Sequence, residues 1–275
     1  MKAKELYEAG KLNDAVAAAI EEVRRHPTNA AHRWLLCELL CFAGELERVD
    51  KHLDLMATQD PKMVAPLSLF RQLIRAEQAR VDFYGEGRLP EFMGKPSAGL
   101  QLCLEASIRT REGKSDEAAA LLQQAEEQRT PVVGNSGGKP FDDLRDMDDM
   151  TAPFLEVFTS TGKYFWIPIE SIRRIEFRKP ERLGDLLWRR ANLAVCGGPD
   201  GEVFLPTRYA GSHEEPDDDV RLGRATDWRG DDGCPVRGVG QRMFMVGQQD
   251  LGILEIEDFD VSNPVSLSTD DPTQA

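Results

Sequence analysis

The chain of 275 residues is poor in the side chains that most often carry catalysis or bind metals. It has four histidines (His26, His32, His52 and His213) and five scattered cysteines, with no C-x-x-C pair. Zinc sites need clustered Cys and His ligands, and no nucleophile–base pair stands out. We therefore expect no catalytic residues, no metal and no cofactor, and we expect buried thiols in a reducing compartment.

Long apolar runs and an excess of basic charge are also missing. No stretch approaches the roughly 18 apolar residues of a transmembrane helix, and the first residues form an amphipathic pattern without the apolar core of a signal peptide. We expect a cytoplasmic protein without membrane insertion. The net charge is −14, from 34 Lys and Arg against 48 Asp and Glu. Such a surface repels phosphate backbones, so we expect no nucleic-acid partner; it suits basic partner segments, or it only maintains solubility.

A period of 34 residues is the main feature that is present. Gly10 and Gly44 are 34 residues apart (44 − 10), and so are Pro27 and Pro61 (61 − 27). Each proline follows its glycine by 17 residues. This is the spacing of tetratricopeptide (TPR) helix–turn–helix units. Repeats of this kind build extended binding surfaces, so the period predicts an adaptor.

The repeat is distorted in its middle. A third turn is predicted near residue 78, where Gln78 stands in place of glycine. Gly113 lies 69 residues after Gly44, two periods plus one, and residues 99–130 fit a further helical hairpin. We predict a TPR-like helical repeat domain over residues 1–131, in which Asp60 and Pro61 end the second unit.

The residue pattern changes from helical to strand-like after this domain. The Gly-rich segment 134–140 interrupts regular structure, so we assign residues 132–149 to a linker and an acidic segment. Residues 150–262 then read as a mostly β domain, and the polar tail 263–275 as frayed. The fold class is α+β, with helical hairpins before a smaller β domain. Residues 186–195 fit a helix or a strand, and strands are predicted at 154–158, 164–168, 172–177, 201–206, 241–246 and 253–256.

One short motif suggests an enzyme. Gly134-Asn135-Ser136-Gly137-Gly138 matches the G-x-S-x-G elbow of serine hydrolases. That elbow needs a strand before the serine and a helix after it, whereas here a predicted helix precedes the motif and Lys139-Pro140 follows it. We favour a linker and keep a serine hydrolase using Ser136 as an alternative.

Four residues are candidates for partner binding in the helical repeats. Trp34 occupies a position that often faces the concave groove of TPR units, and Glu38 follows one turn later. Cys103 and Ser107 hold the corresponding positions of the last unit. An exposed aromatic side chain in the groove would anchor a partner; the alternative for Trp34 is core packing.

Several polar and aromatic strings stand out between residues 80 and 245. They are Arg80-Val81-Asp82-Phe83-Tyr84, Leu89-Pro90-Glu91-Phe92, Asp142-Asp143-Leu144-Arg145-Asp146, Trp166-Ile167-Pro168, Asp185-Leu186-Leu187-Trp188-Arg189, Thr226-Asp227-Trp228 and Gly240-Gln241-Arg242-Met243-Phe244. Together they resemble the ImpE family, also called TagJ, an accessory component of bacterial type VI secretion. The helical repeats before them fit the N-terminal half of that family.

The resemblance implies a non-enzymatic adaptor. Its implied partners are the small subunit of the contractile sheath and the ClpV-type AAA+ ATPase that disassembles contracted sheath. A generic TPR-type assembly chaperone outside secretion is the alternative. The oligomeric state stays open. The family strings are expected to fix the fold through Asp82, Phe83, Tyr84, Trp188, Arg189, Asp227, Trp228, Gln241 and Arg242.

Overall fold

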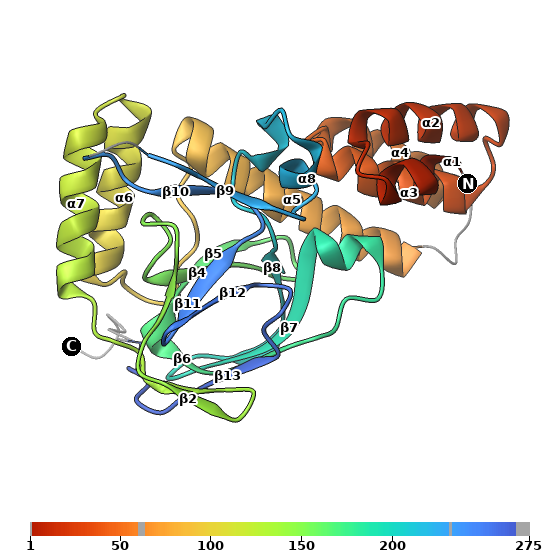
Figure 1. Ribbon diagram of the computed structural model, residues 1–275. Coiled ribbons are helices and arrows are strands. Elements are labelled where there is room, and N and C mark those ends of the chain that lie inside the picture. Colours follow the sequence, from red (N-terminus) through yellow and green to blue (C-terminus); the bar gives the residue numbers. More distant parts are fainter. Residues whose placement is uncertain (1, 60–63, 231–232, 268–275) are drawn as a thin grey trace, which may run out of the picture.

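The computed structural model describes residues 2–59, 64–230 and 233–267. Its N-terminal part is a stack of helices, α1 (Lys2–Glu8), α2 (Leu12–Arg25), α3 (Ala30–Phe42), α4 (Leu46–Gln59) and α5 (Val64–Glu86), each packed on the next. A helical hairpin of α6 (Ala98–Arg111) and α7 (Ser115–Gln128) lies at the far end of α5 (Figure 1). In the described ranges no helix is long and apolar enough to cross a membrane.

The glycines of the 34-residue period lie at the turns of the hairpins. Gly10, Gly44 and Gly113 have φ angles of 73°, 77° and 73°. At the first of them Lys11 N–H donates to the carbonyl of Leu6 at 2.9 Å, which closes the end of α1. Glycine adopts this left-handed conformation without steric cost, so the predicted turns are confirmed. The predicted stop at residues 60 and 61 lies outside the described residues.

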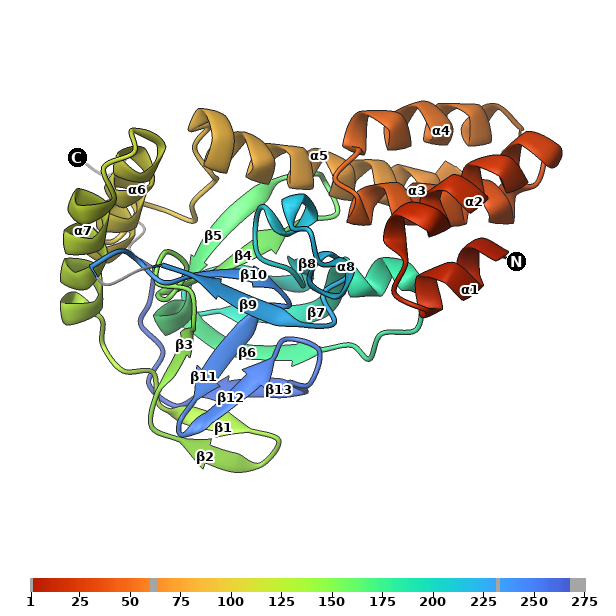
Figure 2. The same cartoon turned by 45° about the horizontal axis from the view of Figure 1, so that its top comes forward.

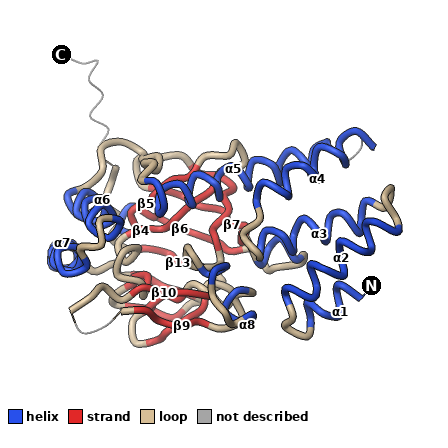
Figure 3. Tube along the Cα trace, turned by 90° about the horizontal axis from the view of Figure 1, so that it is seen from above, coloured by secondary structure: helices blue, strands red, loops and turns tan. Residues whose placement is uncertain are grey.

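The turn predicted near residue 78 is absent because α5 continues through it. The helix spans 23 residues, buries Ile74 and Phe83, and gives way to Gly87 at a φ of 82°. Its length carries it out of the helical stack and along β4 and β5 (Figures 2 and 3). The missing period therefore marks the place where the repeat gives way to a connecting helix.

The C-terminal part is built on an eight-stranded antiparallel sheet in the order β2-β1-β13-β6-β7-β8-β4-β5. A three-stranded sheet, β12-β11-β3, and a two-stranded ribbon, β10-β9, complete it, and the helix α8 (Asp218–Arg221) lies close to β10. The strands are β1 (Gly134–Ser136), β2 (Lys139–Phe141), β3 (Leu144–Asp146), β4 (Phe154–Phe158), β5 (Tyr164–Pro168), β6 (Ile172–Phe177), β7 (Trp188–Val195), β8 (Asp200–Pro206), β9 (Thr226–Arg229), β10 (Arg237–Gly240), β11 (Met243–Val246), β12 (Gln249–Gly252) and β13 (Asp258–Val261).

The segment predicted as a linker is part of these sheets. β1 and β2 form a hairpin whose turn is Gly137-Gly138, both at positive φ. Such a pair suits a tight two-residue turn. Gly134 packs so closely on β13 that an added Cβ would lie 2.2 Å from the carbonyl oxygen of Asp260. The linker prediction for residues 132–149 is therefore wrong, because these glycines serve a hairpin and a close strand contact.

Two further expectations need correction. Residues 253–255 form a turn between β12 and β13 rather than a strand. The tail is not frayed at its start, because Val265 and Leu267 donate backbone hydrogen bonds to Glu170 and Cys196; residues 268–275 lie outside the described part. The ambiguous segment 186–195 forms β7 after a short 3-10 helix, η3 (Leu183–Leu186).

One hydrophobic core joins the two parts of the molecule. It contains buried side chains of the helical stack together with Phe154, Tyr164 and Trp166 of the sheet. Phe83 of α5 packs edge-on against Trp166, with ring centroids 4.8 Å apart, and Phe154 stacks on the same indole. A second core lies among β6, β7, β11 and β13. The α+β fold class is confirmed, and its helices and sheet pack as one body.

Candidate functional site

A buried ion network lies where α5 crosses the sheet. Glu156 of β4 accepts hydrogen bonds from Arg80 Nε at 3.0 Å and Nη2 at 2.8 Å, and it also contacts Arg242 and Tyr164. Arg242 reaches Asp146 of β3 at 3.1 Å. At most 5% of each of these four charged residues is exposed. Charges this deeply buried need such partners, so the network fixes α5 on the sheet.

The electrostatics of the network favour ionised Glu156. Burial acts to raise its pKa, but Arg80 and Arg242 outweigh that effect and hold the pKa at about 2. Asp146 behaves differently: burial raises its pKa to about 6, against the attraction of Arg242. The same low-dielectric surroundings thus give the two carboxylates opposite shifts.

Asp148 extends this network toward the β10 strand. Its carboxylate accepts hydrogen bonds from Nε of Arg237 at 2.9 Å and from the backbone N–H of Gly238 at 2.9 Å. The guanidinium of Arg237 lies over the ring of Tyr84, with its central carbon 5.6 Å from the ring centroid. Tyr84 also donates a hydrogen bond to Glu156 at 3.2 Å. Segments far apart in the sequence, near residues 80, 146, 156 and 240, therefore meet here.

The remaining family-string residues lie around the network or apart from it. Trp188 donates its indole N–H to Glu77 of α5 at 2.8 Å, and Arg189 is buried over Phe177. Gln241 donates to the carbonyl of Gly223 at 2.9 Å.

Three family-string residues lie nearer the surface. Trp228 packs on Tyr209. Asp82 accepts hydrogen bonds from Gln78 and Arg88, and Asp227 pairs with Arg229. The structural role expected for the strings as a group stays a prediction.

The partner-binding residues predicted in the helices do not form an open groove. Glu38, Cys103 and Ser107 are 6%, 0% and 4% exposed, and burial contradicts the prediction that they contact a partner. Trp34 is half-buried and packs on Phe70, with ring centroids 5.1 Å apart. This contact agrees with the core-packing alternative, and the partner-binding role of Trp34 stays a prediction.

Glu38 instead contacts the chain's own C-terminal half. Its carboxylate accepts the backbone N–H of Gly184 in η3 at 3.0 Å. Burial raises the pKa of Glu38 to about 7, against hydrogen bonds from Trp34 and Gly184 that lower it. This carboxylate therefore joins α3 to the segment before β7.

The C-terminal half also covers the turns of the helical stack. Arg208 donates to the carbonyls of Phe42 at 3.1 Å and Cys41 at 3.3 Å. Arg224 donates to the carbonyl of Tyr7 at 2.6 Å, and Leu12 N–H donates to Asp218 at 2.9 Å. Part of the surface that an isolated TPR stack would offer is occupied by the same chain.

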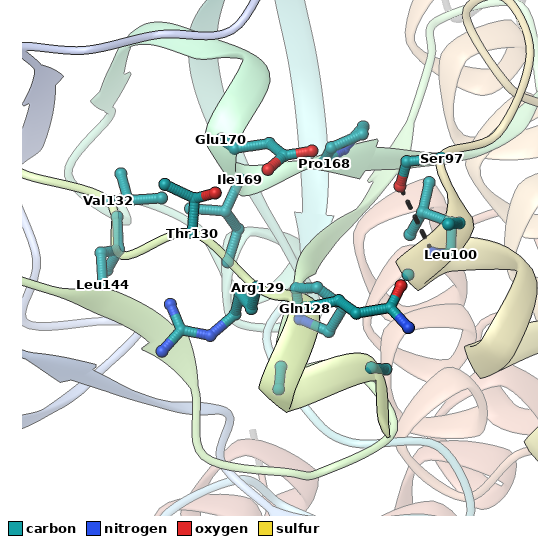
Figure 4. Close-up of a pocket in the computed structure, with 15 residues that line it drawn as sticks. Ser97, Leu100, Gln128, Arg129, Thr130, Val132, Leu144, Pro168, Ile169 and Glu170 are labelled. Atoms are coloured by element: carbon teal, nitrogen blue, oxygen red, sulfur yellow. Dashed lines mark hydrogen bonds between the residues drawn. The ribbon is translucent and has the colours of Figure 1, made fainter. Parts of the chain in front are cut away.

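Several pockets lie between helices and sheet. The first, about 200 Å³, lies between the α6–α7 hairpin and the end of β5; Figure 4 shows Gln128, Arg129 and Glu170 among its lining residues. Arg129 is already paired with Asp143 at 2.5 Å. The second, about 420 Å³, lies beside the ion network, between α5 and residues 206–214 and 237–239. In the described residues no group of three or more His, Cys, Asp or Glu is placed to hold a metal ion.

Sequence reasoning missed Glu156, Glu77 and Arg208. A signal existed for Glu156, because it is the single charge in the apolar strand Phe154–Phe158. A lone carboxylate in a strand buried along its whole length needs a cationic partner. Which arginine supplies it could not be read from the chain, since Arg80 and Arg242 lie 76 and 86 residues away in sequence.

Comparisons with known proteins identify a family and a solved structure of similar fold. The family model described as ImpE protein matches residues 138–260. A protein of Pseudomonas aeruginosa named type VI secretion system accessory component TagJ is 34% identical over 260 residues, covering 94% of this chain and 91% of that protein. The crystal structure of protein VPA1032 from Vibrio parahaemolyticus has a TM-score of 0.89 and 28% identity, covering 95% of this chain and 97% of the other. The chain therefore belongs to the ImpE family.

Proposed function

We propose that the protein is a non-enzymatic accessory component of a bacterial type VI secretion system. It acts as an adaptor that binds the small subunit of the contractile sheath, the ClpV-type ATPase, or both. The observation that carries this proposal is the 34% identity with TagJ across 94% of the chain. The helical-hairpin stack supports it, because stacked hairpins offer long surfaces for protein segments.

The structure favours a rigid adaptor. Helices and sheet share one core, and the ion pair between Arg80 and Glu156 joins them. A partner would meet the outer faces of α2 and α4, or the C-terminal end of α5 where it leaves the stack. The chain's own contacts at Phe42 and Glu38 block the opposite surface.

Binding to purified partners tests this function. The full chain is immobilised, and the small sheath subunit and the ATPase of the same gene cluster are passed over it separately. Saturable binding of at least one of them is expected, and binding of neither would overturn the proposal. A gene neighbourhood without secretion genes would instead favour the generic assembly chaperone.

The serine hydrolase alternative has weak geometric support. Ser136 lies in the β1–β2 hairpin, followed by the turn Gly137-Gly138 and then by a strand. A nucleophile elbow would place a helix there. We expect a labelled fluorophosphonate to leave Ser136 unmodified, as read by mass spectrometry of the intact protein and its peptides. Labelling that Ser136→Ala abolishes would restore the enzyme hypothesis.

A further inference from the structure

One wall of the pocket beside the ion network is formed by helix α5, which has a glycine at this point. Val81 and Gly85 lie one turn apart on α5 and both line it. Val81 is 40% exposed, and a Cβ added at Gly85 would meet nothing within 4 Å. The pocket volume of about 420 Å³ falls in the range of ligand sites. The wall therefore leaves room for a bulky side chain from outside the molecule.

The strand β10 adds an arginine, Arg237, to the lining of this pocket. Arg237 uses only its Nε to bind Asp148. Among the residues that the structure describes, neither terminal amino group of Arg237 has a hydrogen-bond partner, and the side chain is 25% exposed. A cation–π contact with the Tyr84 ring and the pair with Asp148 hold the guanidinium in place. A guanidinium held in this way can take a carboxylate through two parallel hydrogen bonds.

Arg208 adds a second positive charge to the lining. Its hydrogen bonds go to the backbone carbonyls of Cys41, Phe42 and Arg221, and no carboxylate pairs with it in the described chain. Burial lowers its pKa to about 10, so it stays charged at neutral pH.

In the described chain, the two acidic residues of the lining make no hydrogen bond to Arg237 or Arg208. Glu77 is engaged by Arg80 at 3.2 Å and by the Trp188 indole at 2.8 Å. Glu214 is 78% exposed and lies 3.8 Å from His213. The pocket thus combines open apolar space with the two terminal amino groups of Arg237, which have no hydrogen-bond partner among the described residues even though Asp148 pairs with its Nε.

We propose that this pocket is the docking site for a partner segment that carries an acidic group beside an apolar side chain. The carboxylate binds the terminal amino groups of Arg237, and the apolar side chain lies over Val81 and Gly85. The inference rests on the proposed adaptor function, since it assigns the partner contact to the seam between α5 and β10. It also predicts that affinity falls as salt concentration rises, because the ion pair is partly exposed.

Two substitutions test the pocket at two of its elements, α5 and β10. Gly85→Trp fills the open space, and Gly85→Ala is its matched control, with a methyl group that meets nothing. Arg237→Gln removes the charge, and Arg237→Lys keeps it without the fork. Dissociation constants are measured for the purified small sheath subunit and the ATPase, and circular dichroism melts report folding of each variant.

We expect Gly85→Trp and Arg237→Gln to weaken binding at least tenfold, Arg237→Lys to weaken it less, and Gly85→Ala to stay within twofold of the wild type. If Arg237→Gln unfolds because its pair with Asp148 is lost, the binding affinity of Gly85→Trp alone tests the pocket. Wild-type affinity in a folded Gly85→Trp variant would overturn the pocket and leave the adaptor function standing. If the wild type binds neither protein, the adaptor function and this inference both fall.

Discussion

Replacing Glu156 by glutamine tests the buried ion network with little change in volume. The substitution leaves Arg80 and Arg242 facing a neutral amide, with 3% and 1% of their surfaces exposed. Removing one partner of a buried pair costs roughly 3–5 kcal/mol. Each arginine keeps a second carboxylate, Glu77 at 3.2 Å and Asp146 at 3.1 Å. We therefore expect a loss near the lower limit, about 3 kcal/mol in the free energy of unfolding.

Urea unfolding at pH 7, followed by circular dichroism and tryptophan fluorescence, measures this loss. Both probes should report one transition, because Trp166 lies in the core that helices and sheet share. Arg173→Ala is the control: its pair with Asp200 is 2.6 Å long and more than half exposed, and such pairs contribute about 0–1 kcal/mol. A loss for Glu156→Gln no larger than that of the control would refute the reasoning.

The pH dependence gives a second check on the same variant. Glu156 has a folded-state pKa of about 2, below its usual 4.5. A carboxyl with a lowered pKa contributes stability above its unfolded pKa and loses it as the pH falls through the folded value. The difference between wild type and Glu156→Gln should therefore shrink between pH 4.5 and pH 2. A difference that is constant over this range would contradict the assigned charge.

The remaining predictions concern a turn and a raised pKa. In urea unfolding, Gly44→Ala should destabilise the protein by more than 2 kcal/mol and Gly113→Ala by about 1 kcal/mol. Both positions need positive φ, but only at Gly44 would an added Cβ lie 2.2 Å from the His213 ring. Equal losses would argue against the close contact. Glu38 has a folded-state pKa of about 7 against its usual 4.5, so its contribution is present below pH 4.5 and lost as the pH rises to 7. Glu38→Gln keeps an acceptor for Gly184 and should reduce the loss of unfolding free energy between pH 5 and pH 8 by about 2 kcal/mol; an unchanged profile would show that another group titrates.

Local geometry explains which features could be predicted from the sequence. Gly10 and Gly44 could be identified as turns because a residue at positive φ between two apolar helices is almost always glycine. The strands at 154–158 and 164–168 could be identified because their aromatic and β-branched residues suit a pleated, buried surface. The linker prediction failed at Gly137-Gly138, since the same pair marks a flexible segment or a tight hairpin turn depending on what flanks it.

The candidate site depended on contacts that no local pattern records. Trp34 and Cys103 hold positions that face an open groove in a free helical stack, and here Trp34 packs on Phe70 and Cys103 is fully buried. Arg80 and Arg242 belonged to recognisable strings, yet neither string indicated that both side chains end on one glutamate of β4.

The sequence by itself determined the α+β class, the turn glycines and the membership of the ImpE family. Backbone sterics and hydrophobic periodicity depend on residues close together in the sequence, and family similarity depends only on the order of residues. Only the tertiary structure decided that the helical stack is partly covered by its own C-terminal half, and that Arg237 lines a pocket with two amino groups that no described residue engages. Those outcomes depend on packing between residues as far apart as Leu12 and Asp218. Such contacts arise when the shared core forms and excludes water from the ion network.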